Sequence, residues 1–156
     1  LFRSMGIVLL HTPMGTGQDA CKGFCLTQSR ITVITLNADM PDHVRRIVLP
    51  HELGHACLHA RQAGAQAFHD FDLFGVRQTA EYEANVFAAQ LMLEDEDVIR
   101  VLNSDVTFFG AAQLLGVPPE LLDFKFRVLK HRGYHLNAPI VAQGDYLRHL
   151  PMLDTP

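Results

Sequence analysis

Residues 51–55 read His-Glu-Leu-Gly-His, an H-E-x-x-H sequence, and this motif constrains the fold more than any other feature of the chain. On an α-helix, residues four apart differ by about 40° in direction and lie one turn apart, so the imidazoles of His51 and His55 can reach one cation. Glu52 lies on the neighbouring flank, about 60° from His55, where it can contact a metal-bound water but not readily join both histidines as a ligand. The motif therefore predicts a zinc-binding helix with Glu52 as the catalytic base.

The remainder of this helix agrees with a metal site. Leu53, Ala56, Cys57 and Ala60 point away from the two histidines, which gives the helix an apolar back and a histidine front. Gly54 costs about 1 kcal/mol relative to alanine in a helix interior. A gap that admits a substrate or a strand would explain this glycine, and close packing against another element would explain it equally well. The alternative for the motif as a whole is a histidine pair that only caps and packs.

A third ligand is predicted in the segment Glu81-Tyr82-Glu83-Ala84-Asn85. On a helix Glu81 and Glu83 point in directions about 200° apart, so only one of them can face the metal. Small residues share the stripe of Glu81, which would let a second helix approach closely there. Asn85 lies one turn after Glu81 and could hydrogen-bond a ligating imidazole and fix its tautomer. We therefore expect Glu81 to be the ligand and Asn85 to support the site, with Glu83 as the alternative ligand.

Taken together, residues 51–59 (His-Glu-Leu-Gly-His-Ala-Cys-Leu-His) and the later Glu81-x-Glu83-Ala84-Asn85-x-Phe87-Ala88-Ala89 resemble the ImmA/IrrE family of metallopeptidases. Residues 45–49 (Arg-Arg-Ile-Val-Leu) also match the lead into the family's motif, and the resemblance is close over about residues 30–95. The family's glutamate ligand falls on Glu81. His59 resembles a third histidine that is frequent in the family, and we expect it to support the site or to pack rather than to bind metal. The segment 91–94 (Leu-Met-Leu-Glu) departs from relatives, which usually end this segment in a proline.

The resemblance implies a bacterial or phage-borne intracellular protease that cleaves a helix-turn-helix repressor and so derepresses genes. Zinc would be tetrahedral, with His51, His55, Glu81 and a water as ligands, and manganese could replace it. Glu52 would take the proton of the water and pass it to the leaving amine. The exposed edge of a small sheet could hold an extended substrate peptide by strand addition. Neither His69 nor Tyr82, the candidates for stabilising the transition state, has a spacing argument.

Two other functions stay open at this point. The chain could be a metal-binding module that regulates a repressor by binding without cutting it. It could also be a DNA-binding regulator, because 107–132 could form a helix-turn-helix with Gly116 at the turn and basic residues near its end. The net charge of −4 over 156 residues disfavours broad contact with nucleic acid, so we do not expect direct DNA binding.

The surrounding sequence predicts an α+β fold of the zincin-like kind. Residues 5–11, 23–28 and 31–37 are expected to form three strands, the last two as a hairpin. Asp39 and Asp42 are candidate caps for a helix to about Arg61, in which Pro50 either kinks one helix or begins a second. A loop that could contain a short helix is expected over 65–78, and Thr79 should cap a helix over 80–93.

The acidic run 94–97 is expected to be a solvated helix start or a loop rather than a metal site, and 98–102 should be helical. Two short helices should follow over 107–115 and 118–132. We expect a peptidase core over 1–103, a helical segment over 104–134 and an irregular tail over 135–156.

The cysteines and the hydropathy indicate in which compartment the protein is expected to work. Cys21, Cys25 and Cys57 are odd in number and lack the spacing of a disulfide framework or a zinc knuckle, which favours reduced, mostly buried thiols in a cytoplasmic protein. No apolar run approaches the roughly 18 residues that a membrane span needs, and the apolar start has no cleavage-site pattern after it. We expect no membrane partner.

Overall fold

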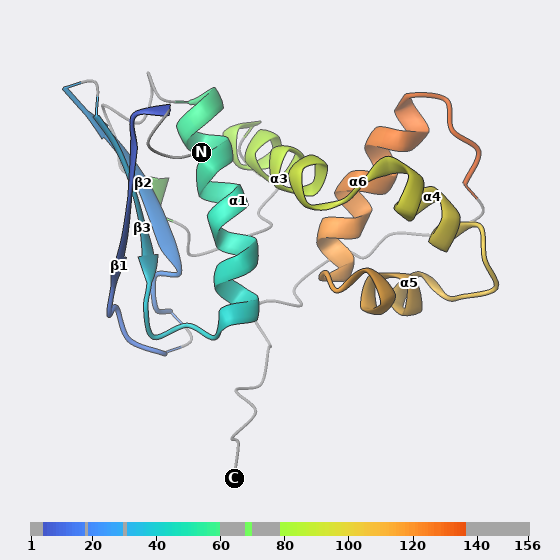
Figure 1. Ribbon diagram of the computed structural model, residues 1–156, viewed down its shortest axis with the longest axis horizontal. Coiled ribbons are helices and arrows are strands. Elements are labelled where there is room, and N and C mark those ends of the chain that lie inside the picture. Colours follow the sequence, from blue (N-terminus) through green and yellow to red (C-terminus); the bar gives the residue numbers. More distant parts are fainter. Residues whose placement is uncertain (1–4, 18, 30, 60–67, 70–78, 137–156) are drawn as a thin grey trace, which may run out of the picture.

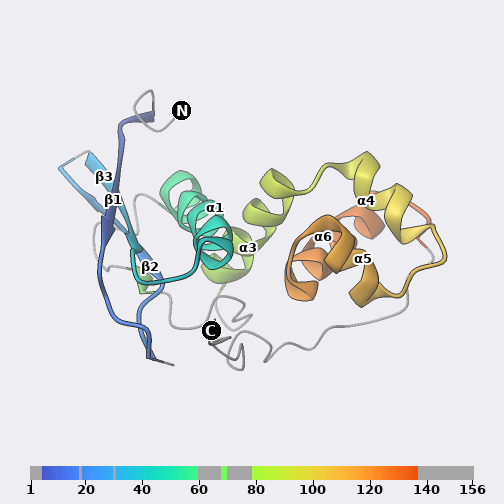
Figure 2. The same ribbon diagram turned by 60° about the horizontal axis from the view of Figure 1, so that its bottom comes forward.

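The computed structural model describes residues 5–17, 19–29, 31–59, 68–69 and 79–136, so most of the predicted loop over 65–78 and of the predicted tail falls outside the described residues. The architecture is α+β, as predicted. The sheet lies at one end of the molecule, α1 and α3 lie beside it, and α4, α5 and α6 form the other end (Figure 1). Figure 2 shows the same arrangement from another side.

The described strands form one sheet in the spatial order β1 (Ile7–Thr12), β3 (Ile31–Asn37), β2 (Gly23–Gln28) and β4 (Phe68–His69). β1 runs parallel to β3, whereas β2 is antiparallel to both of its neighbours. The three predicted strands are confirmed. β4 pairs with the outer edge of β2, inside the segment for which a loop was predicted, and its two residues are too short for a periodic pattern.

Helix α1 (Asp42–Leu58) covers one face of the sheet and is a single helix that continues through Pro50. Its apolar side packs on alternate residues of the strands, because successive strand residues point to opposite faces. The resulting core is made of Ile7, Cys25, Ile34, Leu36, Val44, Ile47, Val48, Leu53 and Ala56. The metal-binding motif therefore lies on a helix whose position is fixed by the main hydrophobic core.

The predicted caps of α1 are wrong. The N-cap is Pro41, and neither Asp39 nor Asp42 caps the helix with its side chain. Asp39 instead accepts a hydrogen bond from the backbone N–H of Gly15 at 2.8 Å, and Asp42 lies in the first turn and pairs with Arg45. Asp42 still suits its position, because a negative charge in the first turn interacts favourably with the helix dipole.

Helix α3 (Thr79–Met92) lies directly against α1, and Gly54 is at a close contact between them. A Cβ atom at position 54 would lie 3.0 Å from the Cα of Ala84, 3.1 Å from its carbonyl oxygen and 3.2 Å from the Cβ of Phe87. Close packing, rather than a gap for a substrate, therefore explains this glycine. The contact also sets the separation of the two helices that carry the candidate ligands.

Three helices follow, α4 (Asp95–Leu102), α5 (Phe108–Leu115) and α6 (Pro119–His131). The hydroxyl oxygen of Thr107 caps α5 by accepting from the N–H of Gly110, and Gly116 ends α5 in the left-handed conformation (φ 66°) that glycine adopts without strain. The three helices share one buried cluster of Leu93, Val98, Leu102, Phe108, Ala111, Ala112, Leu122 and Leu129.

Helix α6 also packs against α3. Ala88 and Ala89 of α3 form a second cluster with Leu121 and Phe124 of α6. Beside it, the ammonium of Lys125 donates to the side-chain oxygen of Gln90 on α3 (2.5 Å) and pairs with Asp95 of α4. The C-terminal helices are thus joined to α3 by both apolar and charged contacts.

The cysteines and the helix lengths test two further expectations. All three cysteines lie among the described residues and none forms a disulfide. Cys25 is buried and Cys21 half-buried, but Cys57 is exposed, so its predicted place on the packed back of α1 is wrong. No helix in the described part of the chain is both long and apolar enough to cross a membrane.

Candidate metal centre

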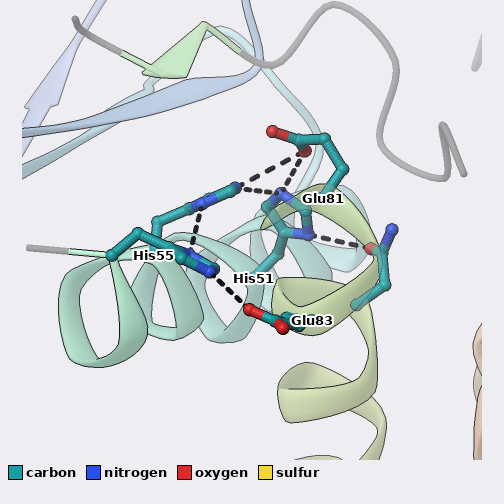
Figure 3. A network of polar contacts seen from close by, with 6 residues as sticks. His51, His55, Glu81 and Glu83 are labelled. Carbon is teal, nitrogen blue, oxygen red and sulfur yellow. Dashed lines mark hydrogen bonds and ion pairs between the residues drawn. The ribbon is translucent and has the colours of Figure 1, made fainter. Parts of the chain in front are cut away.

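Three side chains from two helices converge between α1 and α3 (Figure 3). The Nε2 atoms of His51 and His55 lie 3.0 Å apart. One carboxylate oxygen of Glu81 lies 3.4 Å from the first of these nitrogens and 3.5 Å from the second. The helical spacing places the two imidazoles one turn apart, and the first turn of α3 brings Glu81 to face both of them.

The size of this triangle fits a divalent ion. Zinc binds imidazole nitrogen and carboxylate oxygen at about 2.0–2.2 Å, so two ligand atoms of a tetrahedral site lie about 3.3 Å apart. The three observed separations of 3.0, 3.4 and 3.5 Å bracket this edge length. Two imidazoles and one carboxylate are also a donor set that catalytic zinc sites use, with a fourth position left for water or substrate.

The surroundings of Glu81 keep its carboxylate in the ionised form. Both histidines are buried, and Glu81 is half-buried. Burial by itself would raise the pKa of Glu81, but hydrogen bonding and charge attraction from His51 and His55 outweigh it and lower this pKa to about 2. Glu81 is therefore ionised at neutral pH and can bind a positive ion.

Asn85 lies behind His51. Its side-chain oxygen is 2.8 Å from Nδ1 of His51, and the Asn85 side chain is fully buried. An amide oxygen accepts a hydrogen bond, so Nδ1 of His51 carries the proton and Nε2 presents its lone pair toward His55 and Glu81. This contact holds His51 in the tautomer that a metal ligand needs.

His59 and Glu83 lie behind His55. Nδ1 of His55 is 3.2 Å from Nδ1 of His59, and Nε2 of His59 is 2.9 Å from a carboxylate oxygen of Glu83. Glu83 thus contacts His59 instead of lying in the triangle, as Figure 3 shows. This contact was not predicted, although the sequence contains a signal for it, since His59 follows His55 by one helical turn and Glu83 lies on a different side of α3 from Glu81.

Glu52 is fully buried in α1. Its negative charge, after burial itself, contributes to raising the pKa of Cys25 on β2 to about 12. The carboxylate of Glu52 is therefore close enough to Cys25 for its charge to act there. The same shift keeps the Cys25 thiol protonated and unreactive at neutral pH.

Of the two candidates for stabilising the transition state, the structure describes the side chain of Tyr82 only. Tyr82 packs edge-on against Phe124 of α6, with ring centroids 5.6 Å apart. His69 lies in β4, and its side chain is outside what the structure describes.

Comparison with known proteins places this geometry in a family. Residues 2–127 match the Peptidase_M78 family model, the IrrE N-terminal-like domain. Over 103 residues the chain is 38% identical to "Uncharacterized immunity region protein 2" of Bacillus phage phi105. The matched region covers 66% of this chain and 64% of the relative. The chain thus matches less than two thirds of that relative's length. No solved structure matches the chain. Because the family model covers most of the sequence, the chain belongs to the Peptidase_M78 family of metallopeptidases, as its two motifs led us to expect.

Proposed function

We propose that the protein is a zinc-dependent endopeptidase in which His51, His55 and Glu81 hold the ion and Glu52 is the catalytic base. The observation that carries this proposal is the convergence of two Nε2 atoms and one carboxylate oxygen at separations that suit a tetrahedral ion. Manganese is the alternative ion, because carboxylate and imidazole ligands also accept it.

The chemistry follows from the roles of these groups. When bound, the ion supplies a Lewis acid that lowers the pKa of water from about 15.7 toward 7 and polarises the scissile carbonyl. Glu52 accepts the proton of the attacking water and delivers it to the leaving amine nitrogen. Asn85 holds His51 in the tautomer whose Nε2 would bind the ion, and His59 supports His55 through its Nδ1.

The substrate that we propose is a helix-turn-helix repressor, cut in an extended segment, with derepression of genes as the result. The resemblance to the ImmA/IrrE proteins supports this, and so does the name of the phage relative, which assigns that protein to an immunity region. The exposed edge of the sheet could hold such a segment by backbone pairing. We propose a cytoplasmic enzyme of bacterial or phage origin, built of a core over 1–103, a helical segment over 104–134 and a tail over 135–156.

The test is co-incubation of the purified protein with the helix-turn-helix regulator encoded beside its gene. Cleavage should occur with zinc or manganese and stop when a chelator is added. Glu52→Gln should bind the ion as the wild type does but cut at least about 100-fold more slowly, because it cannot take the proton. Glu96→Gln removes an exposed glutamate of α4 and is the matched control.

Two results would contradict the proposal. A folded wild-type protein that takes up no divalent ion would remove the metal site. Full biological effect of Glu52→Gln on the regulator, with binding but no cleavage, would favour the binding module instead.

A further inference from the structure

The two histidines of the metal centre are supported in different ways. Behind His51 is a neutral amide, that of Asn85. Behind His55 is a chain of two groups, the imidazole of His59 and then the carboxylate of Glu83. This chain runs from α1 to α3, and Figure 3 shows Glu83 on the other side of the histidine pair from Glu81.

When both imidazoles are neutral, as in a site that binds metal through His55, the protons of this chain have one consistent arrangement. A carboxylate only accepts hydrogen bonds, so Nε2 of His59 donates to Glu83. In a neutral imidazole the other nitrogen is then an acceptor, so Nδ1 of His59 accepts from Nδ1–H of His55. That assignment leaves the Nε2 lone pair of His55 directed toward His51 and Glu81. Each donor has an acceptor, and the order of the protons is set by the carboxylate at the end.

We propose that His59 and Glu83 form a hydrogen-bonded relay that positions His55 and strengthens its hold on the divalent ion. This inference rests on the proposed metal site. Both residues are positioning residues, because they act through His55 and do not touch the ion. The negative charge of Glu83 polarises the imidazole of His59, and this makes His59 a stronger acceptor for the Nδ1 proton of His55. His55 is then a more basic metal ligand than it would be beside a neutral group alone.

The exposure of the two groups sets the expected size of the effect. Exposed ion pairs contribute little to stability, and half of the Glu83 side chain is exposed (50%). Its partner is different, because the side chain of His59 is only 4% exposed, so the hydrogen bond orients a buried ring. Groups that orient metal ligands alter metal affinity by about 10- to 100-fold, and we place Glu83 near the lower end, at about tenfold.

The first experiment measures zinc and cobalt affinity by competition with a chromophoric chelator. Glu83→Gln keeps the size of the side chain and removes its charge, and it should weaken both affinities about tenfold, while the exposed control Glu96→Gln should not. His59→Gln should weaken them at least as much. Combining it with Glu83→Gln should add little, because the two groups act in one chain. Thermal unfolding of the metal-free variants checks that each protein is folded.

The second experiment determines which imidazole nitrogens of His55 and His59 carry protons. Long-range ¹H–¹⁵N correlation spectra of the imidazoles in the zinc-loaded wild type should show His59 protonated at Nε2 only and His55 at Nδ1 only. The relay is wrong if His59 carries its proton at Nδ1, or if Glu83→Gln binds both ions as tightly as the wild type. Those results leave the proposed peptidase standing, whereas a wild type that binds no ion overturns both proposals.

Discussion

Asn85 shows how one buried amide can determine the chemistry of the residue in front of it. Its oxygen lies 2.8 Å from Nδ1 of His51, so an apolar replacement of similar size leaves that nitrogen without this acceptor. We expect Asn85→Leu to weaken zinc affinity about 10- to 100-fold, because the orientation and tautomer of His51 are no longer fixed.

Asn85→Asp keeps an acceptor at the same place and should retain more affinity than Asn85→Leu. Chelator competition measures both variants, and Gln113→Leu on the exposed side of α5 is the control for an apolar replacement. Equal affinities for the two Asn85 variants would show that the hydrogen bond is unimportant.

At the scale of elements, the contact between α1 and α3 depends on the absence of one methyl group. Gly54→Ala adds a Cβ 3.0 Å from the Cα of Ala84, and backbone atoms cannot move aside as a flexible side chain would. The gain of up to about 1 kcal/mol in helix propensity is therefore outweighed by about 1–3 kcal/mol of overpacking. We expect a lower free energy of unfolding in urea, and weaker metal binding because the ligands of the two helices are pushed apart.

Gly17→Ala is the control for this substitution, because a Cβ at position 17 meets nothing within 4 Å. Unfolding of the two variants in urea at one pH separates the steric effect from the general effect of replacing a glycine. A Gly54→Ala protein as stable as the wild type would show that α3 can shift without cost.

The elements also show what could be predicted from sequence. The bounds of β2 and β3 were predicted correctly, because two runs rich in strand-forming residues flank the short segment Ser29-Arg30. In the structure Ser29 has the positive φ (49°) of a tight turn. The end of α5 was predicted correctly from Gly116. The N-cap of α1 was not predicted, because Asp39 and Asp42 have other partners that only the folded chain provides.

Within the site, the helical spacing placed His51 and His55 together, since four residues make about one turn. Spacing alone did not reveal that Glu83 would contact His59, because that contact depends on how α3 crosses α1. The exposure of Cys57 could not be predicted for the same reason. The helical pattern gives the direction of its side chain, but it does not show whether another element packs on that side of α1.

At the scale of the whole molecule, the charged contact between the C-terminal helices and α3 makes stability depend on pH. The hydrogen bond from Lys125 is the largest cause that lowers the pKa of Asp95, and Arg132 adds to it. A carboxyl with a lowered pKa in the folded state stabilises the protein fully above its unfolded pKa of about 3.9, and this contribution disappears as the pH falls through the folded value. The Lys125 side chain is almost wholly buried within the fold, since only 2% of it is exposed.

We therefore expect Asp95→Asn to reduce the free energy of unfolding at pH 7 by about 1–3 kcal/mol. Breaking a fully buried ion pair reduces the free energy of unfolding by about 3–5 kcal/mol. We expect a smaller loss here because 33% of the Asp95 side chain is exposed. The difference between wild type and variant should shrink as the pH is lowered below about 4. Urea unfolding between pH 3 and 7 measures it, and a difference that does not depend on pH would rule out the charge as the cause.

Unfolding experiments can also test whether the proposed core over 1–103 folds without the helical segment that follows it. Leu93, Val98 and Leu102 lie within this core, yet they share a buried cluster with α5 and α6. A fragment of residues 1–103 would expose this surface to water, and we expect it to lose cooperative unfolding and to bind hydrophobic dyes. A fragment that melts cooperatively would show that the peptidase core folds without the C-terminal helices.

The parallel pairing of β1 with β3 affects the order in which the chain acquires its structure. The hairpin β2–β3 joins residues close in sequence, such as Gln28 and Ile31, whereas β1 pairs residues 25 apart, as in Ile7 with Thr32. Because closing a longer loop costs more entropy, the hairpin should form early and β1 should dock late. β1, the first of the described strands along the chain, should thus be among the last to pair, and until then the backbone groups that later pair with β3 are open to strands of other chains.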